Sequence, residues 1–323
     1  MLKRTLLSLL LPAALQCAPA SILIRTIDGT QVEGLTQLNS VHLNTSGHAV
    51  DLKLNQFLSV HNGAPASELE AARITSGLAS IQGADRKARD LAVEELTAIG
   101  LPVLTPLIDS YKDTDQHEPR PLYRLFERIV PSYADDFDRG LSLIRLHNGD
   151  AMRGTLAAGT VDVKTASGEQ VNLPWAKIRS MAVRQATVRR AMQIHSLKHS
   201  TQIEYYDTGV VLTEASKVDS SARGLVRLSW NTDSWASDAD GLKKPGSPAY
   251  KSHLVDGHPF GALVGRVGAE GEVFLLGKKS TKTSLKTGRL GLAVNDNKHW
   301  QNNLGTFFVT MTATDAYDLG DGQ

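Results

Sequence analysis

The amino-acid sequence predicts a mostly β, multidomain protein with a duplicated small antiparallel sheet module, an all-helical insert and a C-terminal β-sandwich. Its 323 residues are too many for one ordinary hydrophobic core, so two to three domains are expected. Apolar and polar residues alternate over 21–62, 139–183 and 201–313, as in half-buried strands. Between the first two ranges the apolar period changes to about 3.6 residues, which is typical of helices.

Residues 1–20 are predicted to be a signal peptide. A basic start precedes the apolar run Leu6–Leu15, and Ala18-Pro-Ala20 is a small-residue cleavage signal before Ser21. Cleavage there would remove Cys17, the one cysteine, and with it any thiol nucleophile, disulfide or cysteine-ligated zinc. Lipid attachment at Cys17 is the alternative. The protein is therefore expected to be exported and to be periplasmic, displayed on the cell surface or secreted.

An internal repeat follows the signal. The segment Leu23–Gly34 recurs 120 positions later as Leu143–Gly154, each with an Asp-Gly or Asn-Gly turn between two alternating segments. These segments begin two copies of a small β module, at 21–62 and 139–183, and each copy resembles the short Sm-like barrel units of exported bacterial proteins. Because a module of about 40 residues rarely buries enough surface alone, we expect the copies to pack on each other or on the insert between them.

The insert between the copies, residues 67–138, is predicted to be all-helical. Ile74, Leu78 and Ile81 fall on one helical face, and further apolar residues follow at the same spacing. The part from 88 to 109, with Pro102 at its bend, resembles a HEAT-type helical hairpin. One or two such units form a packing module or a small docking face.

A basic segment, 184–200, is predicted to link the second copy to the sandwich as a short helix or an extended chain, since it contains no acidic residue. Within it, His195 and His199 have the spacing of two metal ligands on one helix face, but no third ligand is evident and a solvated linker is the alternative. Residues 314–323 are assigned to a C-terminal tail.

The richest candidate site is a loop between two alternating strands near the C-terminus. Asn295, Asp296, Asn302 and Asn303 place hard oxygen donors on this short loop, as a calcium site or a site for sugar hydroxyls requires. The alternative is that Asn and Asp occur here only because they are good turn formers.

The segment 201–313 resembles the bacterial calcium-dependent, galactose-specific lectin. The resemblance rests on this loop and on Tyr206–Val210, Phe260–Gly268 and Phe274–Gly277. It implies a jelly-roll-like β-sandwich, calcium as the cofactor, and metal-ligating side chains at Asp296, Asn302 and Asn303. Trp300, His299 and Asn295 are the candidate ligand-binding residues beside the ion. The Trp300 ring would stack on a sugar there, and the alternative is that it folds back on its own sandwich. The sequence departs from the lectin in two places. The loop from Asp296 to Asn302 is one residue shorter than in the lectin, and the His-Pro step with which the lectin contacts sugar has no counterpart around 248–251.

No catalytic motif is evident, so the protein is not expected to be an enzyme: G-x-S-x-G, H-E-x-x-H and the phosphate-binding P-loop are all missing from the sequence. A net charge of +1 gives no field that would attract nucleic acid, and no segment beyond the signal has the apolar length of a membrane span. The sequence therefore predicts calcium-assisted binding of a glycan, such as a cell-envelope polysaccharide. The alternatives are a structural envelope or cell-surface interaction protein and, third, a hydrolase with an unrecognised site. Carboxylates gather around the predicted long loop at 234–252, among them Asp233, Asp238, Asp240 and Asp256, but spacing in a loop does not show whether two of them flank a cleft. The sugar, the partners and the oligomeric state stay open.

Overall fold

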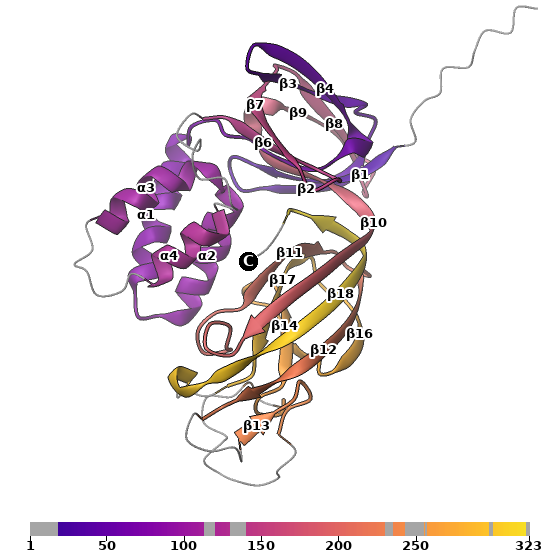
Figure 1. Ribbon diagram of the computed structural model, residues 1–323. Coiled ribbons are helices and arrows are strands. Elements are labelled where there is room, and N and C mark those ends of the chain that lie inside the picture. The colour runs from indigo at the N-terminus through magenta and orange to yellow at the C-terminus, as the bar shows by residue number, and fades with distance from the viewer. Residues whose placement is uncertain are drawn as a thin grey trace, which may run out of the picture.

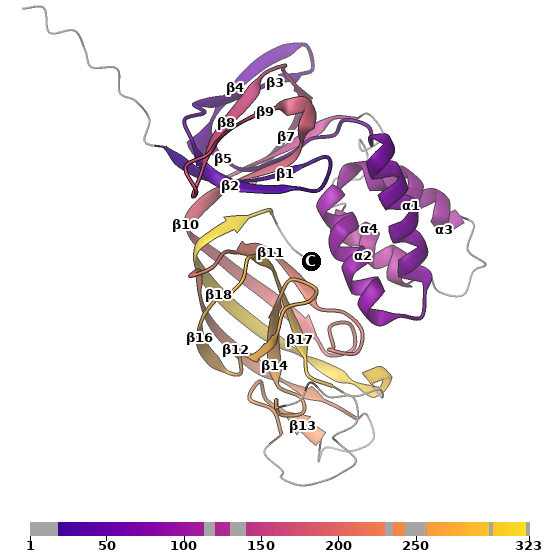
Figure 2. The same cartoon turned by 180° about the vertical axis from the view of Figure 1, so that it is seen from behind.

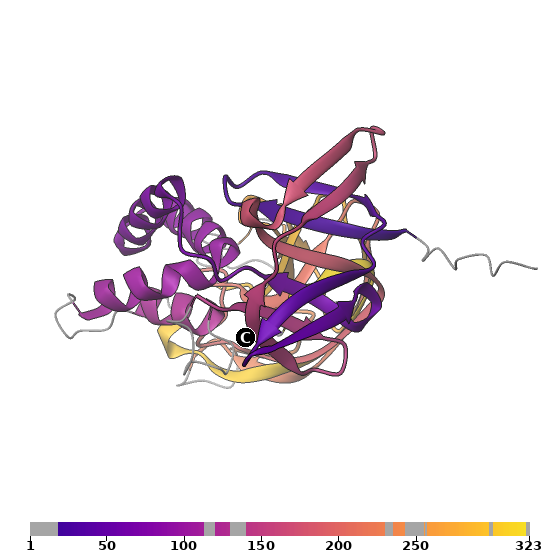
Figure 3. The ribbon, with the colours of Figure 1, turned by 90° about the horizontal axis from the view of Figure 1, so that it is seen from above.

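The computed structural model describes residues 19–112, 120–129, 140–229, 235–242, 255, 257–296 and 300–320. These form three parts: a sheet built from the two repeat copies, a helical insert beside it, and a β-sandwich (Figure 1). Seen from above, the helices lie to one side of the repeat sheet (Figure 3). All strand pairings between the named strands are antiparallel, so the predicted mostly β, multidomain fold class is confirmed.

The two repeat copies contain the same elements in the same order. Copy 1 consists of β1 (Ala20–Thr26), β2 (Gln31–Thr36), β3 (Ser40–Thr45), β4 (His48–Lys53), the 3-10 helix η1 (Leu54–Gln56) and β5 (Phe57–His61). Copy 2 consists of β6 (Ser142–Leu146), β7 (Ala151–Leu156), β8 (Thr160–Thr165), β9 (Gln170–Pro174), the 3-10 helix η4 (Trp175–Lys177) and β10 (Ile178–His195).

The strands of the two copies are exchanged within one sheet. Hydrogen-bonded neighbours follow the order β9-β8-β2-β1-β10-β5-β6-β7-β3-β4, so β2 of copy 1 pairs with β8 of copy 2 and β7 of copy 2 pairs with β3 of copy 1. Reading this order from the other end interchanges the copies. The repeat sheet therefore has an internal two-fold pattern and one common core, to which Ile24 and Val41 contribute from copy 1 and Ile144 and Val163 from copy 2.

Two equivalent glycines permit this exchange. A Cβ atom on Gly34 would lie 2.5 Å from the carbonyl oxygen of Lys164, and one on Gly154 would lie 2.3 Å from that of Asn44. Both pairs of positions are related by the 120-residue offset of the repeat. The recurrence of glycine is thus explained by the close approach of each copy to the backbone of the other.

The helical insert contains α1 (Glu68–Gln82), α2 (Arg86–Ile99), the 3-10 helix η2 (Leu101–Val103), α3 (Leu104–Lys112) and α4 (Arg120–Ile129). The helix α1 begins with a capping box between Ser67 and Glu70, and Asp85 caps α2 by accepting from the Lys87 and Ala88 amides. The helices share a core of their own that includes Ile74, Leu96 and Leu125. None of the described helices is by itself long and apolar enough to cross a membrane. The segments Arg86–Ile99 and Leu101–Ser110 together have the length and composition of a span, but the chain bends by 114° between them.

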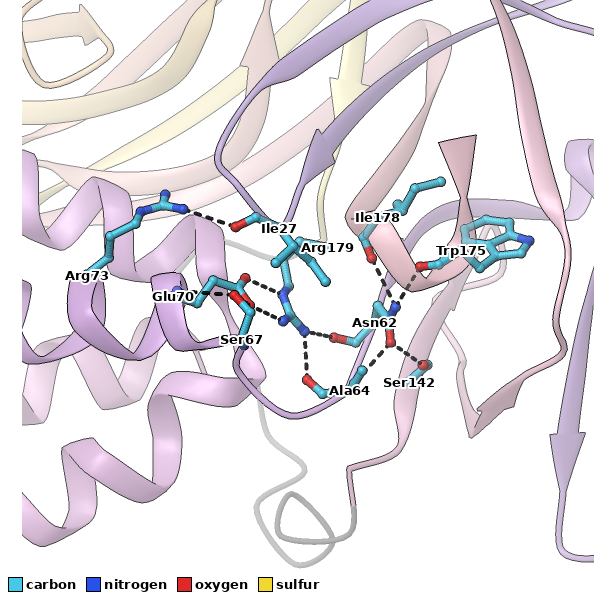
Figure 4. Close-up of polar contacts among 10 residues, drawn as sticks. All are labelled: Ile27, Asn62, Ala64, Ser67, Glu70, Arg73, Ser142, Trp175, Ile178 and Arg179. Carbon is cyan, nitrogen blue, oxygen red and sulfur yellow. Dashed lines mark hydrogen bonds and ion pairs between the residues drawn. The ribbon is translucent and has the colours of Figure 1, made fainter. Parts of the chain in front are cut away.

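A buried ion pair joins the insert to the repeat sheet (Figure 4). The guanidinium of Arg179, on β10, donates to the two carboxylate oxygens of Glu70, on α1, at 2.8 and 2.6 Å. It also donates to the carbonyl oxygens of Asn62 and Ala64 at 2.8 and 2.9 Å. The exposed fractions of these side chains are 2% for Arg179 and 1% for Glu70, so the pair lies in the interior of the protein.

The basic segment 184–200 differs from its prediction as a linker. Residues up to His195 continue β10, which pairs with β18 (Leu304–Asp318) from Arg184 to His195, and Figure 2 shows these two strands side by side. Val188, Met192 and Ile194 point into the sandwich core. These buried residues alternate with exposed ones, which is the pattern of a strand; the exposed residues beside them are Thr187, Arg189, Ala191 and Gln193. The β10 strand thereby belongs to both the repeat sheet and the sandwich. The β18 strand also extends into the predicted C-terminal tail, 314–323, and ends at Asp318.

The sandwich has two sheets, which are joined where Val210 and Val211 of β11 pair with Asp318 and Tyr317 of β18. One contains β10, β18, β12 (Lys217–Arg227), β13 (Ala236–Ser237) and β16 (Lys279–Thr283); the other contains β11 (Tyr206–Leu212), β17 (Gly288–Val294), β14 (Leu263–Val267) and β15 (Val273–Leu275). Val210, Leu292, Phe307 and Val309 are among the buried side chains between them. The loop with the oxygen donors connects β17 to β18 and so passes from one sheet to the other.

Candidate functional site

Buried alternating side chains fix the two ends of the candidate loop. Leu290, Leu292 and Val294 of β17 and Phe307 and Val309 of β18 face the core, so residues 295–303 are held at one end of the sandwich. The loop contains the 3-10 helix η7 (Trp300–Asn302). Residues 297–299 lie outside the described residues, and so does the side chain of Trp300.

Asn295 is fully buried and holds a neighbouring segment in place. Its amide nitrogen donates to the carbonyl oxygens of His258 and Pro259 at 3.1 and 3.2 Å, and its amide oxygen accepts from the Val255 N–H at 3.1 Å. These contacts use the side chain to position backbone that lies beside the loop. The structure thus gives Asn295 a positioning role, and a direct contact with a ligand stays a prediction.

Asp296 and Asn303 are brought together in the interior, with exposed fractions of 1% and 2%. The Asn303 amide nitrogen donates to a carboxylate oxygen of Asp296 and, at 3.2 Å, to the Ser196 carbonyl oxygen. The Asn303 amide oxygen is buried and has no hydrogen-bond partner among the described residues. Asn302 precedes it at the end of η7 and is half-buried.

Thr201, which is distant in the sequence, holds the backbone of Asp296 in place. Its hydroxyl accepts from the Asp296 N–H at 3.1 Å and donates to the Asp296 carbonyl oxygen at 3.2 Å. The hydroxyl of Thr201 and the carbonyl of Ser196 come from the turn between β10 and β11. Sequence reasoning missed both residues, because a contact between positions about 100 residues apart leaves no local pattern.

The donor set fits a hard cation such as calcium. Calcium takes carboxylate and amide oxygens as ligands, and Asp296, Asn302 and Asn303 supply them from one loop. Burial of the Asn303 amide oxygen without a hydrogen bond costs free energy. Rotation of the Asn303 amide by 180° would place this oxygen, instead of the nitrogen, beside the Asp296 carboxylate. A cation would then be held between the amide oxygen and the carboxylate. Among the described residues, no group of three or more His, Cys, Asp or Glu side chains could hold a metal ion, so a cation at this loop would depend on the amide oxygens of Asn302 and Asn303.

The other candidate residues are engaged in local contacts. The His199 Nδ1 atom accepts from the His195 N–H at 3.1 Å, and the His195 Nδ1 atom lies 2.8 Å from the Thr306 hydroxyl. Asp238 and Asp240 both lie near the Lys278 ammonium, at 2.6 and 3.8 Å. Asp233 and Asp256 are outside the described residues.

Comparisons with known proteins find similar chains among solved structures. No family model matches the chain, and no curated protein matches it, so the HEAT-type and Sm-like resemblances stay predictions. Among solved structures, the N-terminal domain of EclA, described as a PllA-like lectin, is similar over 40% of this chain and 98% of that domain, with 19% sequence identity and a TM-score of 0.31. At this TM-score the likeness carries no argument about the fold, the ligand or the role of this chain.

Proposed function

We propose that this protein is an exported, non-catalytic binding protein whose C-terminal sandwich holds calcium in the loop between β17 and β18 and contacts a glycan there. The observation that supports the proposal is the buried Asn303 amide oxygen, which has no hydrogen-bond partner among the described residues and belongs to a side chain in contact with the buried Asp296 carboxylate. A turn without ligand chemistry would not require this arrangement.

Each residue has a distinct role in the proposed site. Asp296 supplies negative charge, and Asn302 and Asn303 supply neutral oxygen donors. Thr201 fixes the backbone of Asp296 through two hydrogen bonds, and the Asn295 side chain positions the backbone of Val255, His258 and Pro259 beside the loop. A bound calcium ion would offer coordination positions to sugar hydroxyls, and Trp300 and His299 are proposed to lie beside them, where an aromatic ring can stack on the apolar face of a sugar.

Calcium should stabilise the full-length mature protein, and Asp296→Asn should abolish this stabilisation. At a calcium concentration one hundred times the Kd, binding to the folded state alone adds about 2.7 kcal/mol to the free energy of unfolding. The substitution removes the carboxylate charge from the site while its size is kept. Thermal unfolding with calcium chloride, magnesium chloride and EDTA measures the effect.

Asp219→Asn is the matched control for this experiment, because Asp219 is an exposed residue of β12 in the same sandwich. It should respond to calcium as the wild type does. An equal calcium response in Asp296→Asn, or none in the wild type, would show that the loop is only a turn and would favour the structural envelope protein. A calcium response without binding to any sugar on a glycan array would leave calcium as a structural ion alone.

The mature protein should begin at or near Ser21 when it is made in its native host. Intact-mass measurement of the protein from the extracytoplasmic fraction checks this expectation. Retention of residues 1–20 would contradict export through this signal, and a lipid-modified Cys17 would favour the lipoprotein alternative. Export matters for the site because extracellular modules can use calcium sites with Kd values of about 0.1–1 mM.

A further inference from the structure

A cavity of about 370 Å³ lies between the helical insert and the sandwich, away from the calcium loop. Its walls come from α1, α2 and α4 on one side and from the 202–207 segment, β14 and β17 on the other. A smaller cavity of about 50 Å³ shares Thr97, Arg128, Asp207 and Arg289 with it and extends to His61 and Arg145. We call the two together the junction cavity and the smaller part its inner end.

The walls of the junction cavity are held by charged contacts between the insert and the sandwich. Arg266 donates to Asp90 at 3.0 Å, and its guanidinium carbon lies 4.1 Å from the centre of the Tyr205 ring. Arg128 donates to the Tyr205 carbonyl oxygen at 2.7 Å. The insert and the sandwich have separate hydrophobic cores, so polar contacts of this kind define the cavity shape.

The inner end has an excess of positive charge. Its described lining residues include three arginines, Arg128, Arg145 and Arg289, and one carboxylate, Asp207. Arg289 is paired with Asp207, and Arg128 is paired with Glu204 of the larger cavity, so the arginines exceed the carboxylates by one. Burial, together with the positive charges of Arg145 and Arg289, lowers the pKa of His61 to about 3, so its ring is neutral and adds no charge. Burial alone would raise the pKa of Asp207, but Arg289 and Arg128 lower it below its usual value, as expected in a positive potential.

We propose that the junction cavity binds a small organic anion. Its carboxylate or phosphate group lies at the inner end beside Arg128 and Arg289, and the rest of the ligand lies against Arg266 and Tyr205. A guanidinium has five N–H donors in a planar fork that matches both kinds of anion. The volume falls within the range of about 300–1,000 Å³ that is usual for small-molecule sites. The remaining lining, which includes Ile81, Val93 and Leu290, provides apolar surface for the body of the ligand.

This site is independent of calcium but adjoins the calcium loop through one short segment. Thr201 contacts Asp296, and the next four residues, 202–205, line the junction cavity. Experiments on the cavity are therefore done on protein and buffers freed of divalent cations with a chelating resin, so that the loop between β17 and β18 takes up no ion. EDTA is avoided, because it is itself a small polycarboxylate anion and would compete for the cavity. Failure of the calcium proposal then leaves the test of the cavity intact, and the reverse also holds.

The test is isothermal titration calorimetry of the full-length mature protein in this metal-free buffer with three probes: galacturonate, galactose and inorganic phosphate. Galacturonate and galactose differ in one carboxylate, so binding of galacturonate without galactose identifies recognition of the anion, and the phosphate titration distinguishes the two anion types. We expect at least one anion to bind. Absence of heat from both anions, or equal binding of galactose and galacturonate, would overturn the proposal.

Two variants locate the binding. In Asp207→Asn with Arg289→Gln the ion pair is removed as a unit, so that no buried charge is left alone, and anion binding should weaken at least ten-fold. Arg128→Gln with Glu204→Gln removes a second pair and should act likewise, which keeps the test valid if one variant fails to fold. The control Arg189→Gln removes an exposed arginine of β10 and should bind as the wild type. Unchanged binding in a folded pair variant would place the anion elsewhere and refute the proposed site.

Discussion

Glu70→Gln should lower the free energy of unfolding by about 3–5 kcal/mol, because it leaves the buried Arg179 guanidinium without a compensating charge. The glutamine side chain can still accept from the Ser67 N–H, a contact that Glu70 makes at 3.1 Å, so the cap of α1 is kept and the loss reports the ion pair. Urea unfolding of the full-length protein, followed by circular dichroism, measures the change. We also expect faster proteolysis in the helical insert, since Arg179 joins it to β10.

Glu68→Gln is the matched control, because Glu68 is exposed and lies in the same first turn of α1. It should change the free energy of unfolding by no more than about 0.5 kcal/mol. Replacing both partners, as in Glu70→Leu with Arg179→Met, should recover part of the lost stability, since no buried charge then remains but the cap at Ser67 and the carbonyl contacts of Arg179 are lost. If Glu70→Gln were as mild as the control, water would have to reach Arg179, and the pair would not join the insert to the sheet as described.

The sequence pattern predicted the hairpins of the repeat sheet correctly. Gly29 and Gly149 lie in the turns of β1–β2 and β6–β7 with φ values of 93° and 89°, a conformation that favours glycine. The pattern could not predict which copy pairs with which. Both copies have the same alternation of apolar residues, so pairing within a copy and exchange between copies bury the same side chains.

Charge misled the prediction for β10. The arginines of 184–190 suggested a solvated linker. The apolar residues Val188, Met192 and Ile194 are fewer than the polar residues around them, but they mark the buried face of a strand. Arg179 gave no signal either, because its partner Glu70 lies 109 positions away and only the fold brings the two together.

The candidate site was predictable as far as it is local. Asp296 and Asn303 share one loop between two strands, and their contact follows from that short connection. The support from Thr201 and Ser196 depends on the turn after β10, and the junction cavity depends on how the insert meets the sandwich. The hydrogen bonds from Thr201 and Ser196 and the lining of the junction cavity join residues that are far apart in the sequence. They therefore could not be predicted before the fold was known.

Gly34→Ala and Gly154→Ala should each lower the free energy of unfolding by about 3 kcal/mol, at the upper end of the usual cost of overpacking. The added methyl group would meet a backbone carbonyl oxygen of the other copy at 2.5 or 2.3 Å, and a backbone atom cannot move aside as a flexible side chain can. The control is Gly159→Ala, whose methyl group would meet Trp175 at an ordinary distance of 3.6 Å. The internal two-fold pattern predicts similar losses at the two positions, measured by urea unfolding of the full-length protein. Pairing within each copy would remove the carbonyl contacts across copies, so harmless alanines at both positions would contradict the exchanged strand order.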